Sequence, residues 1–297
     1  MDKYEDFYQE ELRLQKLAEE EAEAKARDDN FYGRTFDLAD EAEALWDAGE
    51  EVDIDAMVDR VVDPDGHIKE RFRLELEHGK CCRDMPEIPD LPRFIDDAIV
   101  AGVLRATEDF LVYKAFQFVE KRFVAIKRPT IPPAHCNVRL PRFRKEIEAV
   151  SAMDHWNIEV LLCSFIEDEN SDKAYIMTRL VDGSTFDKSK VTDRTCLEIA
   201  RGLQHIHSRG YLHCNMKAET ILVRQCGSPV IIDFEHAEKI GDSTRGPRSD
   251  IYAFGELLSE KLGENTKWSP IIEKCLVGSF ESADALINEI ETLIENK

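Results

Sequence analysis

The sequence has no long apolar run and no closely spaced pair of cysteines. No apolar stretch approaches the ~18 residues that a membrane span needs. The first residues also lack the basic and then apolar layout of a signal peptide. The 8 cysteines include no C-x-x-C pair, which argues against a structural zinc site of the usual spacing. We therefore expect a soluble, reduced, intracellular protein, cytoplasmic or nuclear.

Basic residues are scarce, and the excess of negative charge is concentrated near the start of the chain. The net charge is −22, and residues 1–60 hold 21 acidic and 7 basic side chains, so 14 of the excess charges lie there. Such a region repels nucleic acid and anionic membranes, and we expect neither as a partner. It suits a basic protein partner, although a merely solubilising face is the commoner meaning of a charge run.

The first third of the chain has a helical pattern. Helices are predicted over residues 3–27, 37–48, 54–62 and 67–78, with Gly49 and Gly79 as stop signals. Residues 84–93 carry three prolines at three-residue spacing and predict an extended linker. Residues 1–93 are thus expected to form an acidic helical extension.

Beyond the linker, short β-rich runs come first and helices follow. Strands are predicted over residues 111–118, 122–127, 160–166 and 175–180, with one helix over 141–153 among them. From Arg194 onward the pattern is mostly helical. A small sheet with one helix, followed by a helical half, is an α+β layout.

Five segments in this region stand in an informative order. They are Val-Ala-Ile-Lys at 124–127, Glu146 within a helical stretch, His-Cys-Asn-Met-Lys at 213–217, Ile-Ile-Asp-Phe-Glu at 231–235 and Ser-Asp-Ile-Tyr-Ala-Phe-Gly at 249–255. Together they resemble the signature set of the protein kinases, over roughly residues 98–297. Residues 144–164 and 178–184 look most similar to the Sterile-20 group of serine/threonine kinases.

The resemblance implies a two-lobed kinase-like fold over residues 94–297, with an N-lobe to about residue 180 and a C-lobe from about residue 181. It also implies ATP and Mg²⁺ as cofactors. Lys127 would contact the α- and β-phosphates and pair with Glu146, unless that pair only positions the helix. The other implied roles are the metal at Asp233, the γ-phosphate at Lys217, the gatekeeper at Thr178, and an adenine-binding hinge at Arg179, Leu180 and Val181.

Several positions depart from the family pattern. Asn215 stands where kinases have the catalytic base, and an amide does not accept the substrate proton; loss of such a base typically costs ~10²- to 10⁴-fold in rate. Thr220, a weaker ligand, replaces the asparagine that holds a second Mg²⁺, and Cys214 replaces an arginine. No glycine occurs over residues 104–111, where Glu108 and Asp109 would crowd the phosphates. Glu235 replaces a further glycine.

The segment between Glu235 and Asp250 is short and lacks an A-P-E motif. We therefore interpret the chain as a pseudokinase that acts as a protein-interaction or allosteric module, with weak or no ATP binding. The alternatives are a slow, atypical serine/threonine kinase and a decaying kinase copy without selected activity.

Overall fold

The computed structural model describes residues 38, 41–42, 44–46, 48–61, 73–74, 76–78, 80, 92, 94–107, 109–117, 119–130, 136–167, 174–263 and 265–295. The chain forms two compact units, which divide between Gly102 and Val103. The helix predicted over residues 3–27 lies outside the described residues, as does the predicted linker apart from Pro92.

The first unit has a small core of its own. Its helix α2 (Ile54–Asp59) begins at Asp53, whose carboxylate accepts a hydrogen bond from the Ala56 amide at 3.0 Å. Described residues within 38–46 and 73–78 are also helical, in agreement with two further predicted helices. Lys80 is helical as well, beyond the predicted end of the second of these at residue 78. Gly49 has φ +77°, a conformation that favours glycine, after the first of these. The buried side chains of this core are Ala42, Val52, Met57, Val58, Val61 and Leu76.

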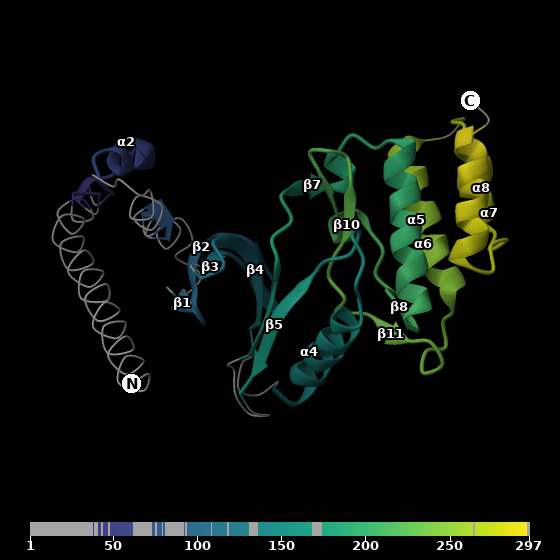
Figure 1. Ribbon diagram of the computed structural model, residues 1–297, viewed down its shortest axis with the longest axis horizontal. Helices are drawn as coiled ribbons and strands as arrows, with labels where there is room; N and C mark the ends of the chain where they lie inside the picture. Colours follow the sequence, from purple (N-terminus) through teal and green to yellow (C-terminus); the bar gives the residue numbers. More distant parts are fainter. Residues whose placement is uncertain are drawn as a thin grey trace, which may run out of the picture. The chain divides into compact units, whose positions relative to one another are not determined.

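A six-stranded sheet has the order β1-β2-β3-β4-β6-β5, and Figure 1 labels its strands β1 to β5. Its strands are β1 (Phe94–Ile95), β2 (Ala98–Ala106), β3 (Phe110–Gln117), β4 (Arg122–Pro129), β5 (Leu161–Ile166) and β6 (Ala174–Arg179). The last four match the predicted strands. The first two were not predicted; the end of β2 falls within residues 104–111, where the kinase resemblance implies a phosphate-binding loop.

Helix α4 (Cys136–Ser151) packs on this sheet through Leu140 and Phe143, which contact Ala174 and Ile176. It begins five residues before the predicted helix. Pro141 was taken as the helix start, but it stands in the second turn, where its missing N–H costs one helical bond.

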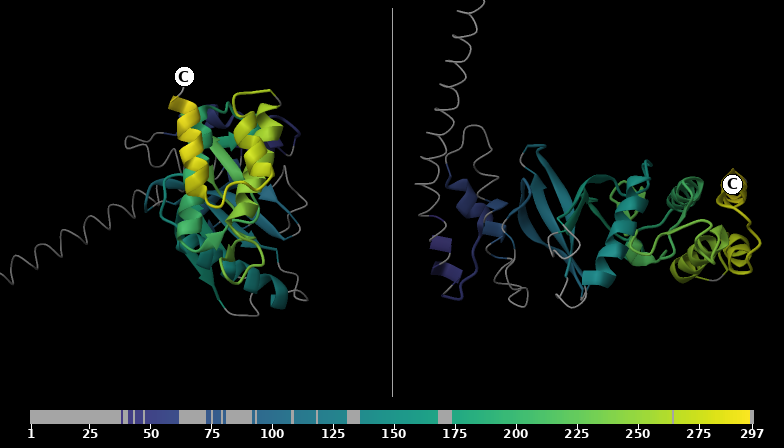
Figure 2. Two further views of the ribbon diagram at one scale, coloured as in Figure 1. Left: turned by 90° about the vertical axis from the view of Figure 1, so that its right-hand side faces the viewer. Right: turned by 90° about the horizontal axis from the view of Figure 1, so that it is seen from below.

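Four helices build the other part of the second unit and lie alongside one another in all views (Figures 1 and 2). They are α5 (Asp193–Ser208), α6 (Pro247–Leu262), α7 (Ser269–Leu276) and α8 (Ala283–Glu295). Gly255 lets α6 and α7 approach closely, because a Cβ there would lie 2.5 Å from that of Cys275. The largest core side chains here include Phe186, Ile199, Leu203, Phe234 and Phe254.

Two small sheets connect the strand-rich and helical parts. One has the order β10-β9-β7, from β7 (Gly183–Thr185), β9 (Ile221–Arg224) and β10 (Pro229–Ile231). The other pairs β8 (Tyr211–Leu212) with β11 (Glu238–Lys239). Short 3-10 helices cover η2 (Phe186–Lys188) and η3 (Ala218–Thr220). No helix in the described part of the chain is both long and apolar enough to cross a bilayer.

Candidate functional site

A pocket of about 460 Å³ lies between the six-stranded sheet and the small sheet of β7, β9 and β10. This volume is typical of small-molecule sites. One end is charged and includes Arg105, Lys127, Glu146 and Asp233. The apolar walls are formed by Leu104, Val112, Ala125, Ile176, Leu222 and Ile232.

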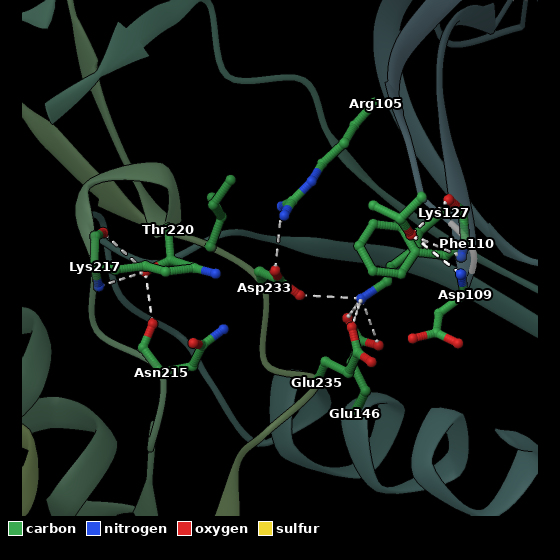
Figure 3. A network of polar contacts seen from close by, with 12 residues as sticks. Arg105, Asp109, Phe110, Lys127, Glu146, Asn215, Lys217, Thr220, Asp233 and Glu235 are labelled. Carbon is green, nitrogen blue, oxygen red and sulfur yellow. Dashed lines mark hydrogen bonds and ion pairs between the residues drawn. The ribbon is translucent and has the colours of Figure 1, made fainter. Parts of the chain in front are cut away.

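Lys127 on β4 is the centre of the charged end. Its Nζ donates to Glu146 Oε1 and Oε2 of α4 at 2.8 and 2.9 Å, and to Asp233 Oδ1 at 3.0 Å. A third carboxylate, that of Glu235, lies 3.3 Å away. The ammonium also stands 4.2 Å from the centroid of the Phe110 ring (Figure 3). The ion pair of Lys127 and Glu146, and its proximity to Asp233, are therefore as predicted.

The ionisation of this cluster follows from burial and from its neighbours. Burial by itself would lower the pKa of Lys127, but the three carboxylates prevail and raise it well above its usual range. Burial raises the pKa of Glu146 to about 7, although Lys127 acts in the opposite direction. Burial also works to raise the pKa of Asp233, yet Lys127 and Arg105 hold that pKa below its ordinary value.

Two residues from the β2–β3 hairpin reach into the charged end. The Arg105 guanidinium extends from β2 to within 3.5 Å of Asp233 Oδ2, and it lies 5.3 Å from the centroid of the Phe110 ring (Figure 3). The connection itself is a tight turn, in which the Thr107 amide donates to the Phe110 carbonyl at 2.9 Å. Neither Arg105 nor Phe110 was among the predicted site residues.

Glu108 and Asp109 were the acidic residues predicted at this hairpin. Asp109 is exposed and is not a lining residue, and Glu108 lies outside the described residues. That Asp109 crowds a phosphate stays a prediction. Of the hairpin residues beside it, Arg105 and Phe110 line the pocket.

Glu159 is a further pocket residue that the sequence did not single out. Its Oε1 accepts a hydrogen bond from the Asp233 amide at 2.6 Å, where Asp233 has φ +70°. Burial raises the pKa of Glu159 to about 8, and the nearby Glu146 carboxylate adds to the effect. Its only signal in the sequence is an acidic residue placed between Ile158 and an apolar run.

The loop before η3 is hydrogen-bonded to a residue of α6. Asp250 is buried, and its carboxylate accepts from the amides of His213 and Cys214 at 2.9 and 2.8 Å. The His213 ring packs edge-on against Phe234, with ring centroids 5.1 Å apart. The Asn215 amide in turn donates to His213 Nδ1 at 3.3 Å, so these contacts fix the backbone beside Asn215.

Comparison with known proteins decides the family. The protein kinase domain matches residues 111–269, which is more than half of the chain. The chain belongs to the protein kinase family.

Individual kinases match shorter stretches. The chain is 31% identical over 116 residues to serine/threonine-protein kinase shk2 of Schizosaccharomyces pombe, covering 37% of this chain and 20% of that protein. It is 28% identical over 184 residues to serine/threonine-protein kinase PrkC of Bacillus subtilis, covering 51% and 28%. A third match, ste20 of Aspergillus fumigatus, is 29% identical over 139 residues, covering 44% and 16%. The chain thus spans under a third of each, and the similarity to Sterile-20 kinases is confirmed.

The predicted hinge residues lie along the apolar end of the pocket. Thr178, the predicted gatekeeper, is buried, and Arg179, Leu180 and Val181 follow it along the pocket wall. The Arg179 amide donates to the Val160 carbonyl at 2.9 Å. Val181 makes no backbone hydrogen bond to any residue that the structure describes, so its amide and carbonyl are available to a ligand.

The remaining predicted residues lie on the catalytic loop. Lys217 is exposed, and its side chain extends from the loop toward Asp233 (Figure 3). Thr220 is buried, and its hydroxyl lies 2.9 Å from the Asn215 carbonyl, 3.1 Å from the Lys217 carbonyl and 3.1 Å from the Lys217 amide. These bonds commit Thr220 to the loop backbone, which does not favour its predicted role as a metal ligand.

Protein kinases in general use ATP and Mg²⁺, with the metal bound by an aspartate and the phosphates. Here both carboxylate oxygens of Asp233 already face cations, Lys127 on one side and Arg105 on the other. Within the described ranges, no group of three or more His, Cys, Asp and Glu side chains is placed to hold a metal ion. In this arrangement, therefore, the residues do not fit Mg²⁺ at Asp233.

Proposed function

We propose that this member of the kinase family is a pseudokinase, a kinase-fold module that transfers no phosphate and acts through protein interaction or allostery. The observation that carries the proposal is Asn215. In the family's sequence pattern Asn215 occupies the position of the catalytic base, and it follows two residues whose amides are bonded to Asp250. A neutral amide takes no proton from a substrate hydroxyl at neutral pH.

The short activation segment supports the same proposal. Only 13 residues lie between Asp233 and the first residue of α6, Pro247. Part of this segment is taken up by β11, which pairs with β8. Little chain is left to orient a peptide, and orientation supplies a large share of the barrier reduction in bimolecular transfer.

Radiolabelled ATP offered with generic basic and acidic protein substrates tests the proposal. Wild type, Asn215→Asp and Asp233→Ala are compared, with Asp233→Ala as the background. We expect all three to give equal, background labelling, because restoring the base does not restore the peptide platform. Labelling by wild type above the Asp233→Ala background contradicts the pseudokinase proposal. A gain in Asn215→Asp alone contradicts the argument from the short segment and leaves that from the base intact.

A slow, atypical serine/threonine kinase is the second candidate. It is favoured by the intact pair of Lys127 and Glu146 and by Asp233 beside it in one cleft. In this case positioning alone would sustain transfer, and Lys127→Ala would abolish it. The same assay separates the two functions.

For the partner, we propose a basic protein rather than nucleic acid or a membrane. Support comes from the charge of residues 1–60, which hold 14 of the 22 excess negative charges. A variant in which acidic residues of this region are replaced by Asn and Gln should lose binding to a basic polypeptide such as polylysine. Binding that is unchanged in this variant, or insensitive to salt, contradicts the proposal.

A further inference from the structure

The charged end of the pocket is neutralised by the protein's own side chains. Lys127 faces Glu146, Asp233 and Glu235, and Arg105 faces the second oxygen of Asp233. Lys127 and Asp233 are each only 12% exposed, so little water screens these contacts. The side chains that would bind phosphates and a metal are therefore already paired with one another.

Arg105 stands where a divalent cation would meet Asp233. Its guanidinium carries the positive charge of this end beside Lys127 and is 39% exposed at the pocket. Mg²⁺ binds proteins through one or two carboxylates together with substrate phosphates and water. A metal here would have to displace Arg105 from Asp233, and the Thr220 hydroxyl is bonded to the catalytic loop instead.

Phosphate groups fit this end poorly as well. To reach Lys127, a phosphate must compete with three carboxylates that the ammonium already contacts. The Phe110 ring covers the ammonium from the hairpin side at 4.2 Å. Like charges brought together in a poorly hydrated site are unfavourable by several kcal/mol.

The hinge end suits an uncharged planar ligand. Its walls are apolar, and the backbone groups of Val181 are available to donate and accept one hydrogen bond each. Glu219, which also lines the pocket, offers a carboxylate acceptor for hydroxyl groups and repels anions. A flat heterocycle carrying a hydroxylated sugar matches these features without using the charged end.

We propose that the pocket binds a purine nucleoside, base and ribose without phosphate, and that Arg105 replaces the divalent cation at Asp233, so that binding needs no metal. This inference deepens the proposed function at the same site, since a module that transfers no phosphate has no use for the polyphosphate. It is tested by binding, whereas the proposed function is tested by transfer. Each of the two proposals can therefore be contradicted while the other stands.

The test is thermal unfolding and calorimetric titration of the full chain with adenosine or ATP, each in excess Mg²⁺ and in EDTA. Ligand binding to the native state raises its melting temperature. We expect adenosine to raise the Tm equally with and without the metal. ATP should bind at least about tenfold more weakly than adenosine, because the repulsion between its phosphates and the carboxylates corresponds to more than a tenfold loss of affinity. Mg²⁺ should not strengthen ATP binding.

Variants at Arg105 test its part separately. In Arg105→Ala, Asp233 loses one of its two cations, and we expect ATP binding to become stronger in Mg²⁺ than in EDTA. Arg105→Lys keeps the charge and should behave as wild type. Arg128→Ala is the matched control, since Arg128 neighbours Lys127 on β4 and does not line the pocket.

Two outcomes overturn the proposal. If Mg²⁺–ATP is the stronger ligand of the wild type, or if adenosine gives no shift at millimolar concentration, the nucleoside assignment is wrong. If Arg105→Ala responds to the metal as wild type does, Arg105 does not take the cation's place. The wild-type comparison decides the ligand even where a variant fails to fold.

Discussion

At the scale of single residues, Lys127 is the residue that makes most of the charged contacts in the pocket. It contacts three carboxylates while only 12% exposed, and Glu146 beside it is 5% exposed. Such groups are stable only as a set, because an unpaired buried charge is strongly unfavourable.

Removal of this lysine should therefore destabilise the fold. Lys127→Met leaves Glu146 without its cation, and we expect the free energy of unfolding to fall by about 3–5 kcal/mol. The double variant Lys127→Met with Glu146→Leu removes both charges and should recover much of this loss. Urea unfolding of the two variants and wild type measures the difference. Equal destabilisation by both would show that packing, and not charge, sets the effect.

His213 supplies a pH-dependent contribution. Its Nε2 donates to the Ile232 carbonyl at 3.2 Å, and its Nδ1 accepts from the Asn215 amide at 3.3 Å, which requires the neutral ring. Burial lowers the pKa of His213 below its ordinary 6.5, despite the opposing effect of Asp250. The contribution of the neutral ring is present above pH 6.5 and is lost as the pH falls through the lowered, folded-state pKa.

We therefore expect the contribution of His213 to the free energy of unfolding to decrease as the pH is lowered from about 7 to about 5, across the ordinary histidine pKa. The raised pKa values of Glu146 and Glu159 act in the opposite direction over this range, so the contribution is measured against a variant of His213. His213→Gln does not titrate and should flatten this dependence, although it is less stable at pH 7. Chemical unfolding at several pH values gives both slopes. Parallel slopes would assign the titration to other groups, such as the stacked His155 and His205, whose pKa values are also lowered by burial.

At the scale of elements, the first turn of α6 supports the catalytic loop. Asp250 accepts from two loop amides and contacts His207 Nε2 at 2.8 Å, all within the interior. Asp250→Ala leaves two buried N–H groups without a partner, and each such group costs about 1–3 kcal/mol. The loop should then open more often than the rest of the fold.

Hydrogen exchange measures this opening directly. The amides of His213 and Cys214 should exchange much faster in Asp250→Ala, and Asp250→Asn, which keeps an acceptor oxygen, should show a smaller effect. Glu256→Ala, on the exposed face of the same helix, is the control and should change neither amide. Unchanged protection at both amides in Asp250→Ala would contradict this role of α6.

The elements of the second unit were largely predictable, because their patterns are local. Short β-rich runs predicted four strands, and the resemblance of the motifs to those of kinases implied that Lys127, Glu146 and Asp233 share one cleft, as the distances confirm. The β2–β3 hairpin was not predicted. Missing glycines revealed what the loop lacks, but not that Arg105 and Phe110 would face inward, since a one-residue change of register reverses which side chains do so.

Glu159 shows the same limit. No motif marks it, and an acidic residue beside an apolar run reads as a solvated side chain. Its contact with the Asp233 amide joins residues 74 positions apart in sequence. Such groups come together only in the folded chain, so the local sequence pattern around Glu159 does not predict the contact.

At the scale of the whole molecule, net charge is the dominant feature. A chain with a net charge of −22 repels itself, and compaction brings these charges closer together. Exposed pairs such as Arg201–Glu291 and Arg248–Glu281 offset little of this, since each contributes about 0–1 kcal/mol. The buried cluster at Lys127 is shielded from ions in solution, and salt should leave it nearly unchanged.

Salt should therefore stabilise this protein. The screening length falls from about 30 Å at 0.01 M to about 3 Å at 1 M salt, which removes most of the repulsion between surface carboxylates. We expect the Tm to rise steadily with sodium chloride at pH 7. Sucrose at equal osmolality is the control for effects unrelated to charge, and a neutralised variant of residues 1–60 should show a smaller rise. A Tm that falls with salt would mean that surface ion pairs outweigh the net charge, and the acidic region would then have to be paired with basic residues of the chain itself.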